Sequence, residues 1–232
     1  MIEVVAMLRG RWADGFALAH GADPAAELAR RGWSGSPVSA TRSSSDDLRI
    51  TYAVRPTRPA GDTVPAARVE QDEGLGTDEV SGAVPHQRVA AYAVVRSSRG
   101  ILLTELSART NAEGMWNLPG GGLDPGEEPA VAVVREVHEE TGQRVTDVRL
   151  LTVLTRHWVG RAPSGRVEDF HAVRLFHTAH CPEPGDPVVL DVGGSTSAAR
   201  WVRETELASL PLASSVPQAL AVAGVPAEAL NP

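Results

Sequence analysis

A chain of 232 residues is long for one small domain and short for two large ones, so we expect one domain of catalytic size with an extension. Its net charge of -7 excludes a protein whose main role is to coat duplex DNA or an anionic membrane, because both roles need a positive surface. The single Cys181 excludes an internal disulfide. The N-terminus has an acidic Glu3, a short apolar run and basic residues only after that run, which is the reverse of a secretory signal. We therefore predict a cytoplasmic protein that binds neither nucleic acid nor membrane.

Residues 1–55 predict a small β-α-β unit. Residues 2–8 are mostly apolar and predict a strand, and residues 48–54 alternate as a half-buried strand does. Between them, "ADPAAELARRG" offers Asp23 as a helix N-cap, Pro24 in the first turn and Gly32 as a stop. A unit this short is near the lower limit for folding alone, so we expect it to pack on the rest of the chain or to mediate a homodimer.

Residues 56–85 are rich in Pro, Gly, Asp and Glu and show little apolar periodicity, so we interpret them as a linker. Residues 86–232 then carry dense signals for strands and turns, which predict one α+β or α/β domain. The expected strands are 88–95, 100–106, 148–159, 170–181 and 199–202, and the expected helices are 129–141 and about 214–223.

The longest uncharged stretch, residues 207–227, is long enough to suggest a membrane span. Pro211, Pro217 and Pro226 would break such a helix, and serines lie between them. No transmembrane segment is predicted.

The strongest predicted helix lies in "LPGGGLDPGEEPAVAVVREVHEETGQ". Pro129 suits its first turn, Glu127 and Glu128 complement the positive end of its dipole, and Gly142 is a natural C-terminal stop. Its expected apolar face, at helical spacing, consists of Ala130, Val133, Val134 and Val137.

Three glutamates, Glu136, Glu139 and Glu140, share another face near the C-terminal end of this helix. Like charges at this spacing cost about 0.2–0.5 kcal/mol per pair, and each acid opposes the helix dipole by about 0.3–1 kcal/mol. Arg135 offsets only part of this charge. A solvated acidic face is one interpretation. The other is a site for Mg²⁺ or Mn²⁺, which prefer carboxylate oxygens.

The surrounding residues favour the metal site, because they form the pattern G-x5-E-x7-R-E-V-x-E-E-x-G. This pattern resembles the signature box of the Nudix hydrolases. It departs from the family at Gln143, where an aliphatic residue is usual, which bears on packing at the helix exit. The residues that carry the resemblance are Gly121, Glu127, Arg135, Glu136, Glu139, Glu140 and Gly142.

The resemblance implies an α/β/α sandwich with a mixed central sheet, in which the box forms a loop-helix-loop. It also implies hydrolysis of a nucleoside diphosphate linked to another moiety, with Mg²⁺ or Mn²⁺ as cofactor. Glu136, Glu139, Glu140 and the Gly121 carbonyl would ligate the metal, and Arg135 would orient them with help from Glu127.

The general base is less well defined by the sequence. Glu136 is the first choice, and the loop before the last strand offers Asp191, Glu183 and Asp186 as alternatives. Asp191 ranks first among these three, although loop acids are usually solvated.

Substrate contacts are suggested by residues in and beside the box. Gly120 and Gly122 flank Gly121 and would let backbone approach the metal and the substrate. Arg156 and Arg161, with His157 and Arg166, border a Gly- and Pro-containing loop that is either solvated or in contact with phosphate. Trp116 and Trp201 either pack or stack on a base, and "FHTAHC" is rejected as a zinc site because a strand places His177 and His180 on opposite faces.

Two functions follow. The first is a pyrophosphohydrolase acting on a nucleotide sugar such as ADP-ribose or on a non-canonical nucleoside triphosphate. Pro163 is a poorly placed counterpart of a proline seen in ADP-ribose hydrolases, so the sequence does not choose between these substrates. The second is a catalytically silent nucleotide sensor, which the complete set of box carboxylates disfavours.

Overall fold

The computed structural model describes residues 1–43, 47–60, 69–162 and 164–230. The chain divides into two compact units. Unit 1 comprises Met1–Ala90 and Val153–Arg174, and unit 2 comprises Ala91–Thr152 and Leu175–Pro232. We describe each unit by itself.

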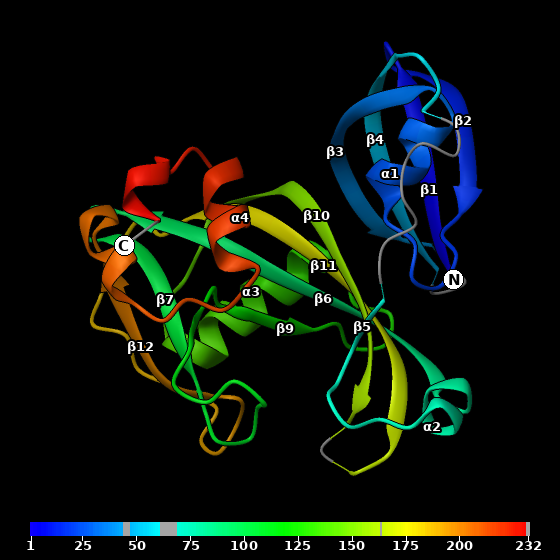
Figure 1. Ribbon diagram of the computed structural model, residues 1–232. Coiled ribbons are helices and arrows are strands. Elements are labelled where there is room, and N and C mark those ends of the chain that lie inside the picture. The colour runs from blue at the N-terminus through cyan, green and yellow to red at the C-terminus, as the bar shows by residue number, and fades with distance from the viewer. Residues whose placement is uncertain (44–46, 61–68, 163, 231–232) are drawn as a thin grey trace. The chain divides into compact units, whose positions relative to one another are not determined.

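The N-terminal part of unit 1 is a four-stranded sheet with one helix (Figure 1). The strands β1 and β4 pair in parallel, with α1 in the connection between them, as the predicted β-α-β unit requires. Ile50, Tyr52 and Val54 alternate inward along β4, and Asp23 caps α1 by accepting from the Ala26 amide. The elements are β1 (Ile2–Leu8), β2 (Arg11–Ala17), α1 (Pro24–Arg30), β3 (Trp33–Arg42) and β4 (Leu48–Pro56), in the sheet order β2-β1-β4-β3.

β2 and β3, the two edge strands of this sheet, have no counterpart among the strands predicted from the sequence. β2 follows a tight turn in which both Arg9 and Gly10 have positive φ, and its burial is irregular. β3 contains Pro37 and several serines, which are poor strand formers but are tolerated at an edge. Neither strand has a clear period-2 pattern, so tertiary pairing decides that they form.

The stretch interpreted as a linker contains regular structure. β5 (Glu70–Gln71) pairs in parallel with β10 through Trp158 and Val159, and α2 (Thr77–Ser81) follows it. Residues 61–68 lie outside the described part of the chain. The domain boundaries at 55 and 85 stay a prediction.

The larger sheet is mixed, so the predicted α/β class with a mixed sheet is confirmed as a curled mixed sheet with helices. β10 and β5 run parallel, whereas β12 and β6 are antiparallel to β7. Its order is β12-β7-β6-β11-β10-β5, with β8 beside β7 and β9 beside β6. The strands are β6 (Val84–Ser97), β7 (Gly100–Leu106), β8 (Trp116–Asn117), β9 (Gly120–Gly122), β10 (Thr146–Arg161), β11 (Val167–His180) and β12 (Thr196–Val202).

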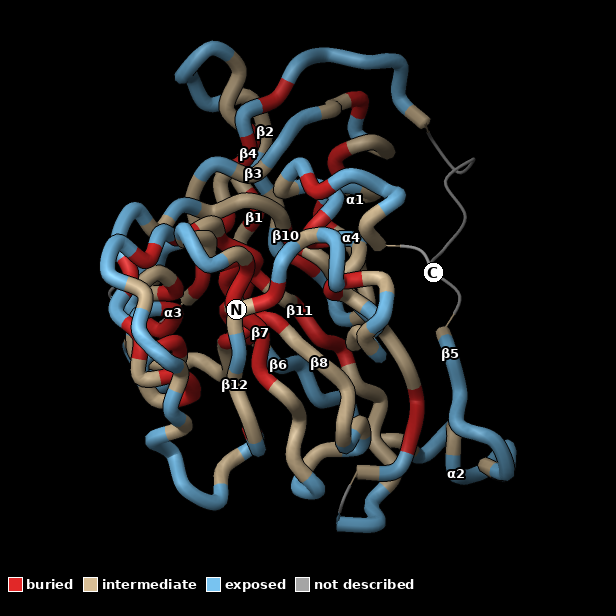
Figure 2. Tube along the Cα trace, turned by 90° about the vertical axis from the view of Figure 1, so that its left-hand side faces the viewer, coloured by how far each residue is buried: buried red, intermediate tan, exposed pale blue. Residues whose placement is uncertain are grey.

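Four helical segments accompany the strands in unit 2: α3 (Pro129–Thr141), η2 (Glu204–Ser209), α4 (Val216–Val222) and η3 (Ala227–Ala229). The helix α3 contacts β9 and β12 (Figure 1). Buried residues gather on α3, β7 and β11 (Figure 2). No helix in the described residues is long and apolar enough to cross a membrane.

The apolar face of α3 differs from the predicted one at two positions. Val133 and Val137 are fully buried as expected, but Ala130 is only half-buried and Val134 is 42% exposed. Ala132 lies in the core instead. Glu136 lies at the border of this buried face, with 15% of its side chain exposed.

Candidate active site

The helix α3 begins and ends where the sequence predicts. Pro129 occupies its first turn, and Gly142 ends it in the left-handed conformation, with φ of 68°. Its last carbonyl groups are satisfied by the following loop, because the Val188 amide donates to Thr141 and the amides of Leu190 and Asp191 donate to Glu139. These bonds offset part of the cost of negative charge at the C-terminal end.

Arg135 is the centre of the carboxylate cluster. Its guanidinium group binds both oxygens of Glu127, at 2.8 Å each, in a bidentate pair. The same group donates to Glu136 at 2.9 Å and to Glu139 at 3.0 Å. A further bond reaches the Gly122 carbonyl at 3.1 Å. One cation thus orients three carboxylates, and the hydrogen bonds to Glu127 are the largest cause that raises the pKa of Arg135.

Glu140 points the other way and is buried, with 5% of the residue exposed. It accepts hydrogen bonds from the Gly120 amide at 2.9 Å and from the Thr196 hydroxyl at 2.5 Å. Burial raises the pKa of Glu140 to about 7, although both hydrogen bonds lower it and nearby Glu136 and Asp191 add repulsion. A carboxylate in this environment gains most from a nearby cation.

Glu136 lies against the glycine run. A Cβ added at Gly121 would stand 2.5 Å from Glu136 Oε1, so only glycine allows the backbone and this carboxylate to approach so closely. Gly120 has φ of 145° and would clash with the Ala91 carbonyl if it carried a side chain. Burial is the largest cause that raises the pKa of Glu136, and Arg135 opposes it. The short strand β9 therefore places Gly120, Gly121 and Gly122 beside the acidic face of α3.

The donor set fits a hard divalent cation. Glu127, Glu136, Glu139 and Glu140 bring four carboxylates to one region of unit 2, and Arg135 bridges three of them. Oxygen ligands of this kind suit Mg²⁺ and Mn²⁺ rather than softer metals. Of the glutamates predicted to bind metal, Glu136 lies beside Gly121 and shares Arg135 with Glu139, and Glu140 lies near Glu136. Their roles as ligands stay a prediction.

The loop acids are separated by the structure. Asp191 lies close enough to Glu140 to raise its pKa, so this loop acid is near the cluster. Asp186 instead forms an ion pair with Arg99 at 2.9 Å. Glu183 lies near Cys181, whose thiol pKa is raised chiefly by burial. The ranking of Asp191 above the other two loop acids is therefore consistent with where the three residues lie.

Sequence reasoning missed Thr196, whose hydroxyl holds Glu140. No local signal marks this residue, because an isolated threonine at the start of a strand is common. It also borders a pocket of about 430 Å³ beside the cluster. The pocket lining includes Arg109, Asp191, Gly194, Thr196 and Ser197, all in unit 2.

Gln143, the departure from the box pattern, is buried and ties the helix exit to the next loop. Its Oε1 accepts from the Gly185 amide at 2.9 Å, and its Nε2 donates to the Thr141 carbonyl at 3.2 Å. The amide of Gln143 is therefore hydrogen-bonded at the position where the family pattern usually has an aliphatic residue.

Gln143→Ala is expected to lower the free energy of unfolding by about 0.5–1.5 kcal/mol, because it removes the hydrogen bonds of a buried side chain to the Gly185 amide and the Thr141 carbonyl. Urea denaturation monitored by circular dichroism measures this loss. Gln218→Ala, an exposed position on α4, is the matched control and should change stability by less than about 0.5 kcal/mol. Equal stability of the two variants would contradict the role of Gln143.

The two arginines predicted to contact substrate lie in unit 1, whereas the carboxylate cluster lies in unit 2. Arg156 pairs with Glu70, and its guanidinium group lies 4.9 Å from the centre of the Trp158 ring. Arg161 pairs with Glu79. The structure therefore gives both arginines protein partners and does not group them with the glutamates. Pro163 lies outside the described residues.

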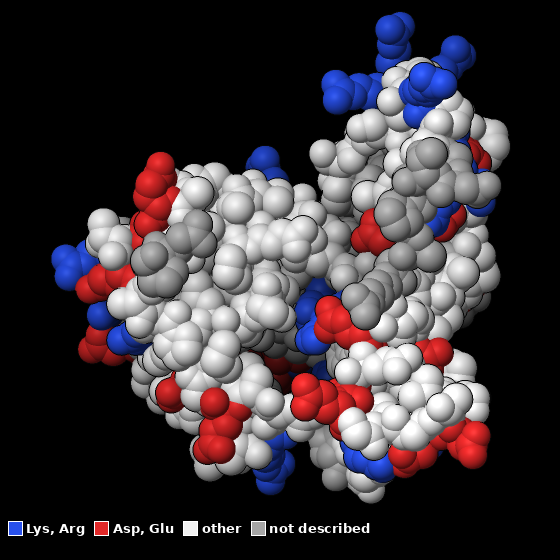
Figure 3. All heavy atoms as spheres, in the orientation of Figure 1, with Lys and Arg blue, Asp and Glu red and all other residues white. Residues whose placement is uncertain are grey.

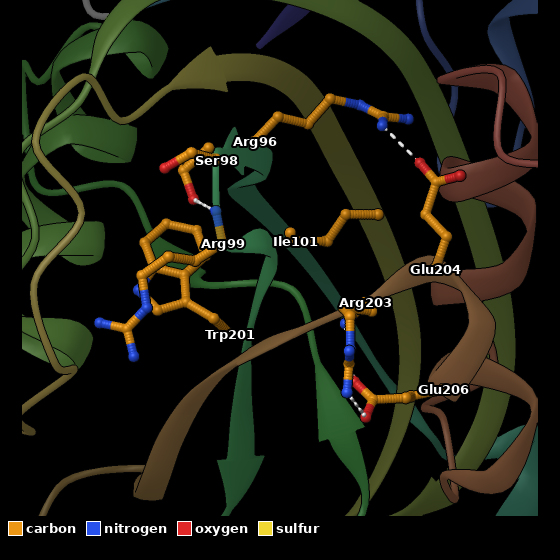
Figure 4. Close-up of a pocket in the computed structure, with 10 residues that line it drawn as sticks. Arg96, Ser98, Arg99, Ile101, Trp201, Arg203, Glu204 and Glu206 are labelled. Carbon is orange, nitrogen blue, oxygen red and sulfur yellow. Dashed lines mark hydrogen bonds and ion pairs between the residues drawn. The ribbon is translucent and has the colours of Figure 1, made fainter.

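The two tryptophans also have structural partners. Trp116 lies under the Arg200 guanidinium group, 4.4 Å from the ring centre. The Trp201 indole donates to the Gly185 carbonyl at 2.9 Å. It lines a second pocket, of about 750 Å³, where Arg96 is paired with Glu204 and Arg203 with Glu206 (Figure 4). Arg99 also lines this pocket and is paired with Asp186.

The rejected zinc motif behaves as the strand geometry predicts. His177 is buried with its Nδ1 3.4 Å from the Tyr92 carbonyl, whereas His180 is exposed. Cys181 is buried beside Gln143. On the face shown in Figure 3, acidic and basic side chains of the described residues are interspersed.

Comparisons with known proteins support the resemblance. A model of the NUDIX domain family matches residues 86–221. The chain is 46% identical over 52 residues to the RNA pyrophosphohydrolase of Pectobacterium atrosepticum, covering 22% of this chain and 29% of that protein. It is 38% identical over 85 residues to nucleoside diphosphate-linked moiety X motif 6 of Mus musculus, covering 36% and 26%. The chain thus spans less than a third of the length of these two relatives.

Among solved structures, the MutT NUDIX hydrolase of Burkholderia pseudomallei is similar to this chain. The two sequences are 30% identical, with a TM-score of 0.46. The similarity covers 59% of this chain and 97% of that one.

Proposed function

Because the chain belongs to the Nudix family, we propose that it is a metal-dependent pyrophosphohydrolase that cleaves the diphosphate of a nucleoside diphosphate linked to another moiety. The observation that carries this proposal is the arrangement of Arg135, which orients Glu127, Glu136 and Glu139 beside the glycine run. A degraded box would lack these carboxylates. The relatives named above include an RNA pyrophosphohydrolase, and their similarity is confined to short segments that do not define the substrate.

The proposed metal ligands are Glu136, Glu139, Glu140 and the Gly121 carbonyl. Mg²⁺ or Mn²⁺, when bound, would neutralise the negative charge of the diphosphate and lower the pKa of a bound water. Glu140 is held in place by Gly120 and Thr196, so its geometry is fixed before any ligand arrives. Glu139 is the most exposed of the three, with 46% of its side chain accessible.

Glu136 is the proposed general base as well as a proposed metal ligand. Its side chain is 15% exposed, and burial raises its pKa toward the working range of a base. Arg135 keeps its carboxylate oriented through the 2.9 Å hydrogen bond. Asp191 is the alternative base, because it lines the adjacent pocket and lies near Glu140.

The pocket beside Thr196 is the proposed substrate site. It combines Arg109, a cation that can pair with phosphate, with Asp191, an acceptor that can bind ribose hydroxyls. ADP-ribose-like nucleotide sugars and non-canonical nucleoside triphosphates both contain phosphates and ribose hydroxyls. The proposal is limited to this substrate class.

Substrate profiling tests the proposed function. The full chain is incubated with ADP-ribose, other nucleotide sugars and nucleoside triphosphates, and released nucleoside monophosphate or pyrophosphate is measured. We expect turnover of at least one class with Mg²⁺ or Mn²⁺ and none after chelation with EDTA. Tight binding of a nucleotide without turnover of any compound would favour the sensor function and refute the hydrolase.

A further inference from the structure

Two histidines and an aspartate meet in unit 1, apart from the box residues. His20 lies in the turn between β2 and α1, His157 lies on β10 and Asp169 lies on β11. One donor atom from each lies within 4.8 Å of the other two. Among the described residues, this is the only group of three or more His, Cys, Asp or Glu side chains whose donor atoms converge so closely. We name it the His-Asp cluster.

The donor atoms of the His-Asp cluster point at one another. Asp169 Oδ1 lies 2.5 Å from His157 Nε2 and 3.3 Å from His20 Nε2. The side chains are 26%, 15% and 28% exposed for Asp169, His157 and His20, so the cluster is accessible to an ion while being largely shielded. The imidazole rings of His20 and His157 lie edge to face, with centroids 5.2 Å apart.

The backbone around His20 is shaped to hold this arrangement. Gly21 has φ of 75°, and a Cβ there would lie 2.4 Å from His157 Nδ1, so glycine allows the turn to approach the ring. On the same turn, the Asp23 carboxylate accepts a hydrogen bond from the Thr155 hydroxyl at 2.9 Å. The turn is thus held against β10 immediately after His20, and Nε2 of His157 faces Asp169.

A third histidine lies beside the cluster. His171 is fully buried, and its ring lies 5.4 Å from that of His20 and 6.2 Å from that of His157. The Gln87 side-chain amide donates to its Nδ1 at 2.9 Å, so the neutral ring carries its proton on Nε2, beside the Ala22 backbone. His171 therefore packs against the cluster without adding a lone pair to it.

We propose that the His-Asp cluster binds a divalent transition-metal ion of the Zn²⁺ class. His20 Nε2, His157 Nε2 and the Asp169 carboxylate are the ligands. Two imidazoles with one carboxylate match the donor preference of Zn²⁺, whereas Mg²⁺ and Ca²⁺ prefer oxygen. Zn²⁺ bonds of about 2.0 Å in a tetrahedral site place donor atoms about 3.3 Å apart. The distance between His20 Nε2 and Asp169 Oδ1 already fits, and the shorter distance between His157 Nε2 and Asp169 Oδ1 would widen.

The proposed site has a structural role. The ion would join the turn at His20 to the strands β10 and β11, which all belong to unit 1. His20 is distant in sequence from His157 and Asp169, so a bond through the ion would restrain a long loop of chain. The glutamates of α3 form a separate, oxygen-only site in unit 2, and the two sites differ in the metal they prefer.

The test is isothermal titration of the metal-free full-length chain with Zn²⁺ in a large excess of Mg²⁺, which occupies oxygen-only sites. We expect a single equivalent of Zn²⁺ to bind, and Co²⁺ in its place to give visible absorption bands of a nitrogen- and oxygen-ligated site. His20→Ala and Asp169→Asn should each weaken Zn²⁺ binding by at least about tenfold. His180→Ala, an exposed histidine on β11, is the matched control and should bind as wild type does.

Two outcomes would overturn the proposal. One is wild-type Zn²⁺ affinity in both His20→Ala and Asp169→Asn, and the other is no Zn²⁺ binding by the wild-type chain in excess Mg²⁺, which would leave a hydrogen-bonded cluster only. His20 lies in an exposed turn, so its replacement keeps the test valid even if Asp169→Asn fails to fold. Because neither readout involves turnover, failure here is distinguishable from failure of the hydrolase proposal.

Discussion

Glu136→Gln is expected to reduce the turnover number of Mg²⁺-dependent hydrolysis by about 10²–10⁴-fold while the fold is retained. Glutamine has the same shape and can still accept the hydrogen bond from Arg135, but it neither takes a proton nor carries charge for a metal. The close contact with Gly121 also leaves no room for a larger replacement. Initial rates measured against Mg²⁺ concentration give both the turnover number and the apparent metal affinity.

These two quantities separate the roles of Glu136. A lower turnover number with unchanged Mg²⁺ dependence identifies the general base, whereas a shift in the Mg²⁺ dependence identifies a ligand. The matched control is Glu113→Gln, an exposed glutamate in the loop between β7 and β8, which should retain wild-type rates. If Glu136→Gln kept its turnover within a few fold of wild type, Glu136 would have neither role and Asp191 would become the leading candidate.

Arg135→Ala is expected to lower the free energy of unfolding by about 1.5–3 kcal/mol at neutral pH, in the absence of divalent cations. Its guanidinium group makes charge-assisted bonds to Glu127 and Glu136, whose side chains are only 10% and 15% exposed. Removing it leaves these carboxylates without their cation and exposes the repulsion between Glu136 and Glu139. Urea denaturation followed by circular dichroism measures the change.

Two further variants sharpen this experiment. Arg135→Lys keeps the charge but not the planar fork that binds both Glu127 oxygens, so it should recover only part of the lost stability. Arg149→Ala, at an exposed position on β10, should change stability by less than about 0.5 kcal/mol. Wild-type stability in Arg135→Ala would show that the cluster does not depend on its central cation.

The sequence alone predicts the helix α3 and the grouping of its charged residues, because both depend on short-range signals. Pro129 and Gly142 set the ends of α3 through backbone geometry, and helical spacing alone places Arg135 beside Glu136 and Glu139. The strand Gly100–Leu106 was likewise predicted with its observed ends, because its apolar residues are bounded by turn signals. The mixed sheet was implied by the resemblance to the Nudix hydrolases, because the order of strands and helices alone is compatible with either an α+β or an α/β domain.

The tertiary structure decided everything that depends on residues far apart in sequence. Thr196 donates to Glu140 only because β12 pairs with β7. Gln143 accepts a hydrogen bond from Gly185 only because a loop distant in sequence packs against the end of α3. The edge strands β2 and β3 form through pairing with β1 and β4 rather than through their own patterns. Strand register likewise brings His20, His157 and Asp169 together, since no local pattern relates three side chains from a turn and two distant strands.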